Sequence, residues 1–240
     1  LFCLLKIIRT IHILKHTFLP KAIMQKVYSK TEELLNTWSH AFGILGGMIM
    51  GIILMVWSVM HMDGYMIWGI SLYMFGMIGS YIASTIYHAL PVESKWKLRL
   101  RKWDHAAIYW HIAGSYSPLT LAVMWQQSVW GLILFIFVWS CAILGTIISF
   151  AKVKNKHNYF ETIAFVGMGL SIIVAFKPLL DCAGLIAVSW IVAEGVCYIT
   201  GAIFYSLRKR FMHAVFHFFV LAGSACHIIA IWQAMLVYWE

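Results

Sequence analysis

The chain has 240 residues, of which 62% are hydrophobic and only 11% carry a charged side chain. With a mean hydropathy of +0.82 and successive apolar runs of about 20 residues, this composition excludes a soluble globular domain and predicts a protein that lies mostly in lipid. The net charge of +9 is compatible with nucleic-acid binding, but no loop between the apolar runs is long enough to fold into a basic domain. We therefore expect an integral membrane protein that binds no nucleic acid.

Residues 1–30 form a basic segment that is distinct from the rest of the chain. They mix apolar residues with cations such as Lys6 and Arg9, as an interfacial amphipathic helix does, and they lack the uninterrupted apolar stretch and cleavage site of a signal peptide. Pro20 interrupts the segment and Met24 follows it. We expect Met24 to be the natural start, with residues 1–23 an extension; the alternative is a helix that lies on the membrane surface.

Residues 31–240 are predicted to form one domain, an all-α bundle of seven transmembrane helices. Each apolar run is long enough to cross a hydrocarbon core of about 30 Å. Glycines spaced by four in the first run, at Gly43, Gly47 and Gly51, predict close helix packing in lipid. The expected spans are 38–60, 65–89, 104–125, 128–150, 159–177, 182–206 and 212–237.

Basic residues lie on alternate loops of this bundle, and this pattern predicts its orientation. All but one of the 18 lysines and arginines precede the first span or lie between spans two and three, four and five, or six and seven; only Lys177 lies on the other side. Loops rich in lysine and arginine stay in the cytoplasm. We therefore expect a cytoplasmic N-terminus and an external C-terminus.

Four side chains of the kinds that bind metals share one membrane depth in this arrangement. His88 ends the second predicted span, Asp104 begins the third, and His213 and His217 begin the seventh. Because consecutive spans run in opposite directions, these helix ends lie on one face, the cytoplasmic one. Ionisable groups within a bilayer are costly and are retained mainly where they pair, conduct or bind. This level is therefore the predicted functional site.

The spacing of these residues predicts a metal site. His213 and His217, at i and i+4, project from one helix face, although such a pair alone is more often interfacial or hydrogen-bonded than metal-binding. His88 supplies a third imidazole, and three neutral histidines leave one tetrahedral position of zinc open for water. Asp104 can then orient that water or take its proton. Ser84, one turn before His88, completes the candidate set.

The sequence allows more than one interpretation of His40 and of Glu194, and it places His227 apart from the predicted site. His40 begins the first span at the same level, where it either supports the metal ligands or lies near the lipid headgroups. His227 lies ten residues beyond His217, roughly 15 Å deeper, which is too far for the same metal ion. Glu194, in the middle of the sixth span, is protonated, paired with a polar neighbour or solvated in a cavity.

Several short motifs follow one another from about residue 30 to the end of the chain. They are Glu33-Leu-Leu-Asn36-Thr-Trp-Ser39-His40, Ser84-Thr-Ile-Tyr87-His88, Trp103-Asp104-His-Ala-Ala-Ile108, Gly114-Ser-Tyr-Ser-Pro118, His213-Ala-Val-Phe-His217 and Gly223-Ser-Ala-Cys-His227. In this order and spacing they resemble the signature set of the hemolysin III family, the bacterial branch of the progestin and adipoQ receptor group.

The resemblance implies a seven-helix protein of the bacterial cytoplasmic (inner) membrane, with zinc near the cytoplasmic helix ends. The family's zinc ligands fall on His88, His213 and His217, its water-associated acid on Asp104, and its related serine on Ser84. Hydrolysis of a lipid amide such as a ceramide is proposed for eukaryotic relatives. The family name reflects a cytolytic, pore-forming interpretation.

Three classes of function follow from these patterns. The first is a zinc-dependent hydrolase that acts on a membrane lipid amide or ester. The second is a cytolytic pore former, which would need oligomers around a water-filled path, whereas the apolar spans offer no obvious continuous polar stripe. The third is a non-catalytic sensor or regulator of membrane lipids in which zinc only fixes the helices. The residues favour a metal-binding membrane protein with hydrolase chemistry.

Overall fold

The computed structural model of the chain describes residues 28–61, 63–151, 159–207 and 209–239, and the regular structure within these ranges is entirely helical. All of the helices belong to one contact unit, residues 28–151 and 158–240. The expectations for the N-terminal segment, including a natural start at Met24, lie outside the described residues.

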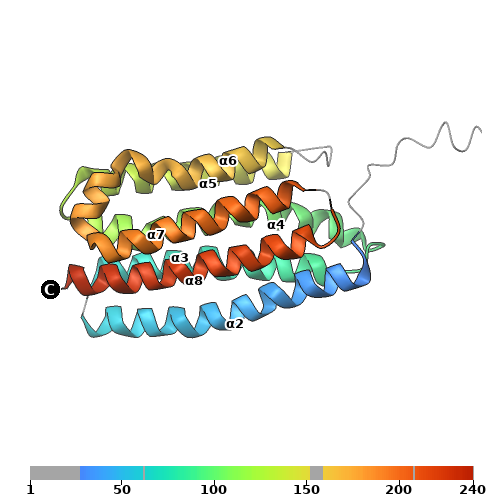
Figure 1. The fold of residues 1–240 in the computed structure, drawn as a ribbon, viewed down its shortest axis with the longest axis horizontal. Coiled ribbons are helices and arrows are strands. Elements are labelled where there is room, and N and C mark those ends of the chain that lie inside the picture. Colours follow the sequence, from blue (N-terminus) through green and yellow to red (C-terminus); the bar gives the residue numbers. More distant parts are fainter. Residues whose placement is uncertain (1–27, 62, 152–158, 208, 240) are drawn as a thin grey trace, which may run out of the picture. The chain divides into compact units, whose positions relative to one another are not determined.

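Seven α-helices and two shorter helical segments make up the described part of the chain (Figure 1). A π-helix, Leu119–Met124, continues α4, and a 3-10 helix, Ser171–Ala175, joins α6 to α7. The α-helices are α2 (Lys30–Met60), α3 (Gly64–Ala89), α4 (Lys95–Pro118), α5 (Val129–Ala151), α6 (Tyr159–Leu170), α7 (Phe176–Ser206) and α8 (Met212–Tyr238).

Five helical stretches are long and apolar enough to cross a membrane: α2, α3, α5, α8 and the 46-residue stretch Glu161–Ser206. The basic α4 does not meet this criterion. The predicted class, an all-α integral membrane protein, is therefore confirmed, whereas the count of seven spans and the orientation stay predictions.

Capping side chains explain why several helices begin before the apolar runs do. Ser29 caps α2 in a capping box, in which its hydroxyl accepts from the backbone N–H of Glu32 and the Glu32 carboxylate accepts from the backbone N–H of Ser29. Asp63 and Ser94 cap α3 and α4, where each side chain accepts one backbone N–H of the first turn. Helices α2 and α4 consequently start eight or nine residues ahead of the predicted spans.

One end of the bundle gathers several helix termini that are distant in the sequence. The start of α4 contacts the end of α3, because Lys97 donates to the carbonyl of Leu90. Further along α4, His105 contacts Glu161 at the start of α6. The end of α7 meets the start of α8 where Tyr205 packs on His213. Figure 1 shows the chain reversing between α6 and the main part of α7, where Gly184 breaks the helix with φ 78°.

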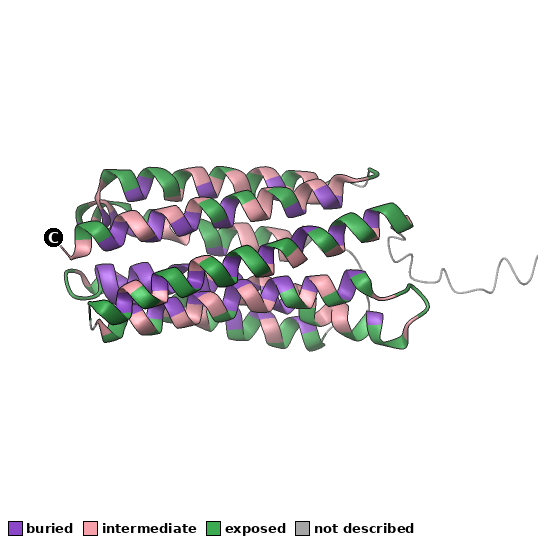
Figure 2. Cartoon of the chain, turned by 90° about the horizontal axis from the view of Figure 1, so that it is seen from below, coloured by how far each residue is buried: buried purple, intermediate pink, exposed green. Residues whose placement is uncertain are grey.

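Exposed residues recur along the outer faces of the helices (Figure 2), and many of them are large and apolar. Phe42, Ile143 and Leu185 are each more than half exposed. Apolar surface on this scale suits lipid and would be unstable in water. Inside, the backbones of α3 and α4 approach so closely that a Cβ added at Gly76 would clash with the carbonyl of Trp110.

The glycines spaced along α2 pack against α3, as predicted. A Cβ at Gly47 would meet the side chain of Met77, and one at Gly51 would meet Met74. This close contact places the first turns of α2 beside the end of α3, where the candidate site lies.

Candidate metal centre

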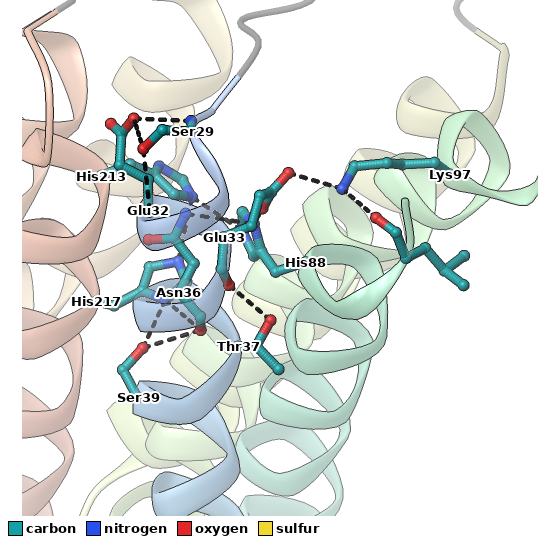
Figure 3. Close-up of polar contacts among 11 residues, drawn as sticks. Ser29, Glu32, Glu33, Asn36, Thr37, Ser39, His88, Lys97, His213 and His217 are labelled. Carbon is teal, nitrogen blue, oxygen red and sulfur yellow. Dashed lines mark hydrogen bonds and ion pairs between the residues drawn. The ribbon is translucent and has the colours of Figure 1, made fainter. Parts of the chain in front are cut away.

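Three histidine side chains converge at the end of the bundle where the helix termini gather (Figure 3). His88 comes from the last turn of α3, and His213 and His217 come from the first turns of α8. The Nε2 atom of His213 lies 3.1 Å from Nε2 of His88 and 3.2 Å from Nε2 of His217. All three side chains are buried. The structure thus brings together the three histidines that the sequence predicted as ligands.

Helix α2 holds two of these rings in the tautomer that metal binding needs. Nδ1 of His88 lies 2.6 Å from a carboxylate oxygen of Glu33, so it donates its hydrogen there. Nδ1 of His217 lies 3.2 Å from the backbone carbonyl of Asn36 and 3.0 Å from the hydroxyl of Ser39. A protonated Nδ1 leaves Nε2 with a free lone pair. The two Nε2 atoms therefore face the shared point as acceptors.

The spacing of the nitrogens fits a tetrahedral metal ion. Bonds of about 2.0–2.1 Å from zinc to imidazole place neighbouring nitrogens about 3.3 Å apart, close to the 3.1 and 3.2 Å found here. At these distances Nε2 of His213 can either donate a hydrogen to a neighbouring ring or share a cation with both neighbours. His88, His213 and His217 can therefore hold a metal ion, with ligand atoms all within 4.8 Å of one another.

Glu33 links the candidate ligand His88 to a buried cation. One carboxylate oxygen accepts from His88, and the other accepts from the ammonium of Lys97 at 2.7 Å. Lys97 also donates to the carbonyl of Leu90 at 2.7 Å and is only 2% exposed. Buried lysines are almost always paired. The chain His88, Glu33, Lys97 therefore ties α3, α2 and α4 together at the site (Figure 3).

Glu32 performs a similar task for α8. Its carboxylate accepts from the backbone N–H of Phe211 at 2.9 Å, while its other oxygen accepts from the hydroxyl and the backbone N–H of Ser29. Phe211 has φ 63°, an uncommon conformation for a residue other than glycine. Glu32 therefore fixes the turn that leads directly into His213.

The two predicted catalytic residues lie on the neighbouring helices α4 and α3. Asp104 is half-buried in α4, and no hydrogen bond or ion pair to its carboxylate occurs within the described ranges. Its carboxylate interacts electrostatically with the phenol groups of Tyr28 and Tyr205. The rings of these two tyrosines pack against His213, with centroids 5.0 and 5.6 Å from that of the imidazole. Ser84 is buried one turn before His88 in α3.

Tyr28 packs against the site just before the start of α2. Its ring centroid lies 5.7 Å from that of His88 and 5.0 Å from that of His213. Burial raises the pKa of Tyr28 well above its usual range, and the nearby charge of Asp104 contributes in the same direction. The Tyr28 side chain is therefore a neutral phenol that shields the histidines from solvent.

His40 packs against His217, one of the three candidate ligands. Its ring stacks on that of His217, with centroids 3.8 Å apart and planes within 2° of parallel. It is 6% exposed, and neither ring nitrogen has a hydrogen-bond partner among the described residues. This position agrees with the first of the two interpretations of His40, in which it supports the candidate metal ligands.

A second polar cluster lies deeper between the helices. Glu194 pairs with Nδ1 of His227 at 2.7 Å, so the carboxylate has the polar neighbour that was one of three expectations. Nearby, the hydroxyl of Tyr81 donates to Ser224, and Ser224 lies 3.3 Å from Nε2 of His111. His227 is not part of the histidine group, in agreement with its predicted depth.

The sequence did not identify the residues that orient the ligands. Glu33, Asn36 and Ser39 have i, i+3 and i+6 spacing, which places them on one face of α2. This spacing could have indicated that the three polar side chains face the same site. Lys97 gave no such signal, because it is one of several cations in a basic loop. Its burial depends on contacts between α2, α3 and α4.

These features define a class of protein, a helical membrane protein with a buried three-histidine centre at one end of the bundle. Residues 28–228 match the sequence model of a family described as Haemolysin-III related. The chain belongs to this family.

Several known proteins are similar to the chain over most of its length. The Hemolysin-3 homolog of Bacillus subtilis (strain 168) is 31% identical over 200 residues, 83% of this chain and 92% of the relative. Hemolysin-3 of Bacillus cereus is 34% identical over 195 residues, 81% of this chain and 87% of the relative. The Monocyte to macrophage differentiation factor of Homo sapiens is 27% identical over 215 residues, 84% of each chain.

Proposed function

We propose that the protein is a zinc-dependent hydrolase of a membrane lipid amide or ester. The observation that carries this proposal is the convergence of three histidines whose Nε2 atoms are 3.1 and 3.2 Å apart, with two Nδ1 atoms held by acceptors on α2. A set of three imidazoles suits zinc and leaves a fourth position for a reactant, the arrangement of catalytic rather than structural sites.

The side chains around the histidines take separate roles in this proposal. Zinc, when bound by His88, His213 and His217, would supply Lewis acidity toward a water and a substrate carbonyl. A carboxylate oxygen of Asp104 takes the proton that the attacking water loses. Ser84 hydrogen-bonds the reacting groups from α3, and Tyr28 limits the entry of bulk water. The acyl chain of the substrate lies in the surrounding lipid.

The proposed topology has seven spans, with the N-terminus in the cytoplasm and the site at the cytoplasmic face of the bacterial cytoplasmic membrane. The stretch Glu161–Ser206 supports two crossings, because 46 residues are about twice what one crossing needs and Gly184 interrupts the helix. The third crossing is the apolar part of α4 with its π-helical continuation. Lysines and arginines at the histidine end support the orientation.

Cytolysis is the second candidate function, and the name Hemolysin-3 of the Bacillus cereus relative favours it. A pore needs polar side chains on a surface that faces water. The polar side chains of α3, α4 and α8 instead bond to one another inside the bundle, as Tyr81, Ser224 and His111 do. This internal pairing supports the hydrolase over the pore. A lipid sensor with structural zinc would differ from the hydrolase only in the absence of turnover.

Metal content and lipid turnover, measured on one purified preparation, test the proposal. The protein is expected to bind about one zinc per chain and to release fatty acid from at least one class in a panel of ceramides, acyl amides and acyl esters. A chelator should stop the release, and added zinc should restore it. Turnover that survives complete removal of zinc, or no turnover across the panel, would contradict the hydrolase.

A further inference from the structure

We propose that Glu33 and Lys97 form a positioning pair that sets the metal affinity of the three-histidine centre without touching the metal ion. This inference rests on the proposed metal site and not on the proposed hydrolysis. Helix α2 contributes none of the three histidines, yet a carboxylate oxygen of its Glu33 lies 2.6 Å from Nδ1 of His88.

The geometry divides the two oxygens of Glu33 between two partners. Oε2 accepts from His88, and Oε1 accepts from the Lys97 ammonium at 2.7 Å. The ammonium makes a further hydrogen bond to the carbonyl of Leu90 and lies 5.1 Å from the centre of the Tyr87 ring. The Lys97 ammonium therefore has three partners within the protein and is almost fully buried, which suits a structural cation better than a substrate-binding one.

Burial makes this linkage strong. The side chains of His88, Lys97 and Glu33 are 0%, 3% and 15% exposed. Water screens such contacts little, and removing one member leaves the other charge buried without its partner. The carboxylate is thus held at one place relative to the imidazole of His88.

A carboxylate at Nδ1 acts on the metal through the ring. It fixes the orientation and tautomer of the imidazole and raises the basicity of Nε2, and loss of such a partner typically weakens metal binding by about 10–100-fold. Lys97 acts one step further away. By holding Oε1, it prevents the carboxylate from turning away from His88. Its effect on the metal should therefore depend on the presence of Glu33.

Zinc affinity measured by competition with a chromophoric chelator tests the pair on the full chain in detergent. Glu33→Gln should weaken zinc binding by about 10–100-fold, and Lys97→Met should weaken it by a smaller factor. In the Glu33→Gln background, Lys97→Met should change affinity less than about twofold, because the group that Lys97 holds is gone. Glu161→Gln is the matched control, since Glu161 also pairs with a histidine, His105, at the same end of the bundle.

A second readout separates positioning from a general loss of structure. Cobalt bound in place of zinc should give a visible absorption spectrum that changes in Glu33→Gln at full metal loading and stays unchanged in Glu161→Gln. If Glu33→Gln fails to fold, Glu33→Asp, which is one methylene too short to reach both partners, should show an intermediate loss of affinity. Equal zinc affinity in the parent and in a folded Glu33→Gln protein would overturn this inference alone. A parent that binds no zinc would instead overturn the proposed metal site.

Discussion

The carboxylate of Asp104 separates a catalytic centre from a structural one. A structural zinc needs its ligands only, whereas a hydrolase also needs a base for the proton of water. Asp104→Asn should keep the fold and the bound zinc, yet lower lipid hydrolysis by roughly two to four orders of magnitude. Steady-state rates and metal content of the variant check this.

The control for Asp104 is Asp181→Asn, which makes the same change at an exposed carboxylate that pairs with Lys177. It should leave hydrolysis at the parental rate. An Asp104→Asn protein that also hydrolyses lipid at the parental rate would exclude Asp104 as the base.

The buried pair of Glu194 and His227 is expected to contribute to stability and not to metal binding. Glu194→Ala leaves His227 without a partner, which should lower the free energy of unfolding by roughly 1–3 kcal/mol. Chemical denaturation in micelles measures this effect, and zinc content should stay at the parental value. The double variant Glu194→Leu/His227→Phe should recover part of the loss, because it removes both polar groups. A double variant less stable than Glu194→Ala would contradict this account.

At the scale of elements, helix α2 organises the site although it supplies no ligand. Ser29 caps this helix, and Glu32 and Glu33 lie in its first turn, where acidic side chains interact favourably with the helix dipole. A place at the start of a helix is therefore enough to account for acidic residues at these two positions, and the sequence gives no sign of their further contacts. Their contacts with Phe211, His88 and Lys97 depend on how α2, α3 and α8 pack, and no local pattern predicts that packing.

Close packing between α3 and α4 gives a test at this scale. Gly76→Ala would place a methyl group against the carbonyl of Trp110, so the helices must separate. Such overpacking should lower the free energy of unfolding by roughly 1–3 kcal/mol. Gly79→Ala in the same helix meets nothing within 4 Å and should be neutral or slightly stabilising. Thermal unfolding of both variants in micelles checks the prediction, and equal stabilities would contradict it.

At the scale of the whole molecule, the sequence predicted the helix order and the meeting of three ligands, because hydropathy and alternating direction determine which helix ends lie together. It placed the start of α2 at residue 38 and that of α4 at residue 104, whereas they begin at Lys30 and Lys95. Hydropathy detects only the part of a helix that suits lipid. The capped, charged turns outside that part are helical as well, and they hold Glu33 and Lys97.

Orientation stays a prediction that fusion proteins can test. If the basic loops are cytoplasmic, a reporter that is active only outside the cytoplasm should be silent when fused after Arg210 and active when fused after Glu240. The reverse pattern would place the histidine centre at the external face. It would also exclude hydrolysis of inner-leaflet lipids.

The zinc content of histidine variants tests the central claim most directly. The parent should hold about one zinc per chain, and His213→Ala/His217→Ala should lose it, because one imidazole cannot retain the ion. His227→Ala, which removes a histidine of the same helix outside the group, should keep the parental content. A double variant that retains a full equivalent of zinc would contradict the three-histidine centre.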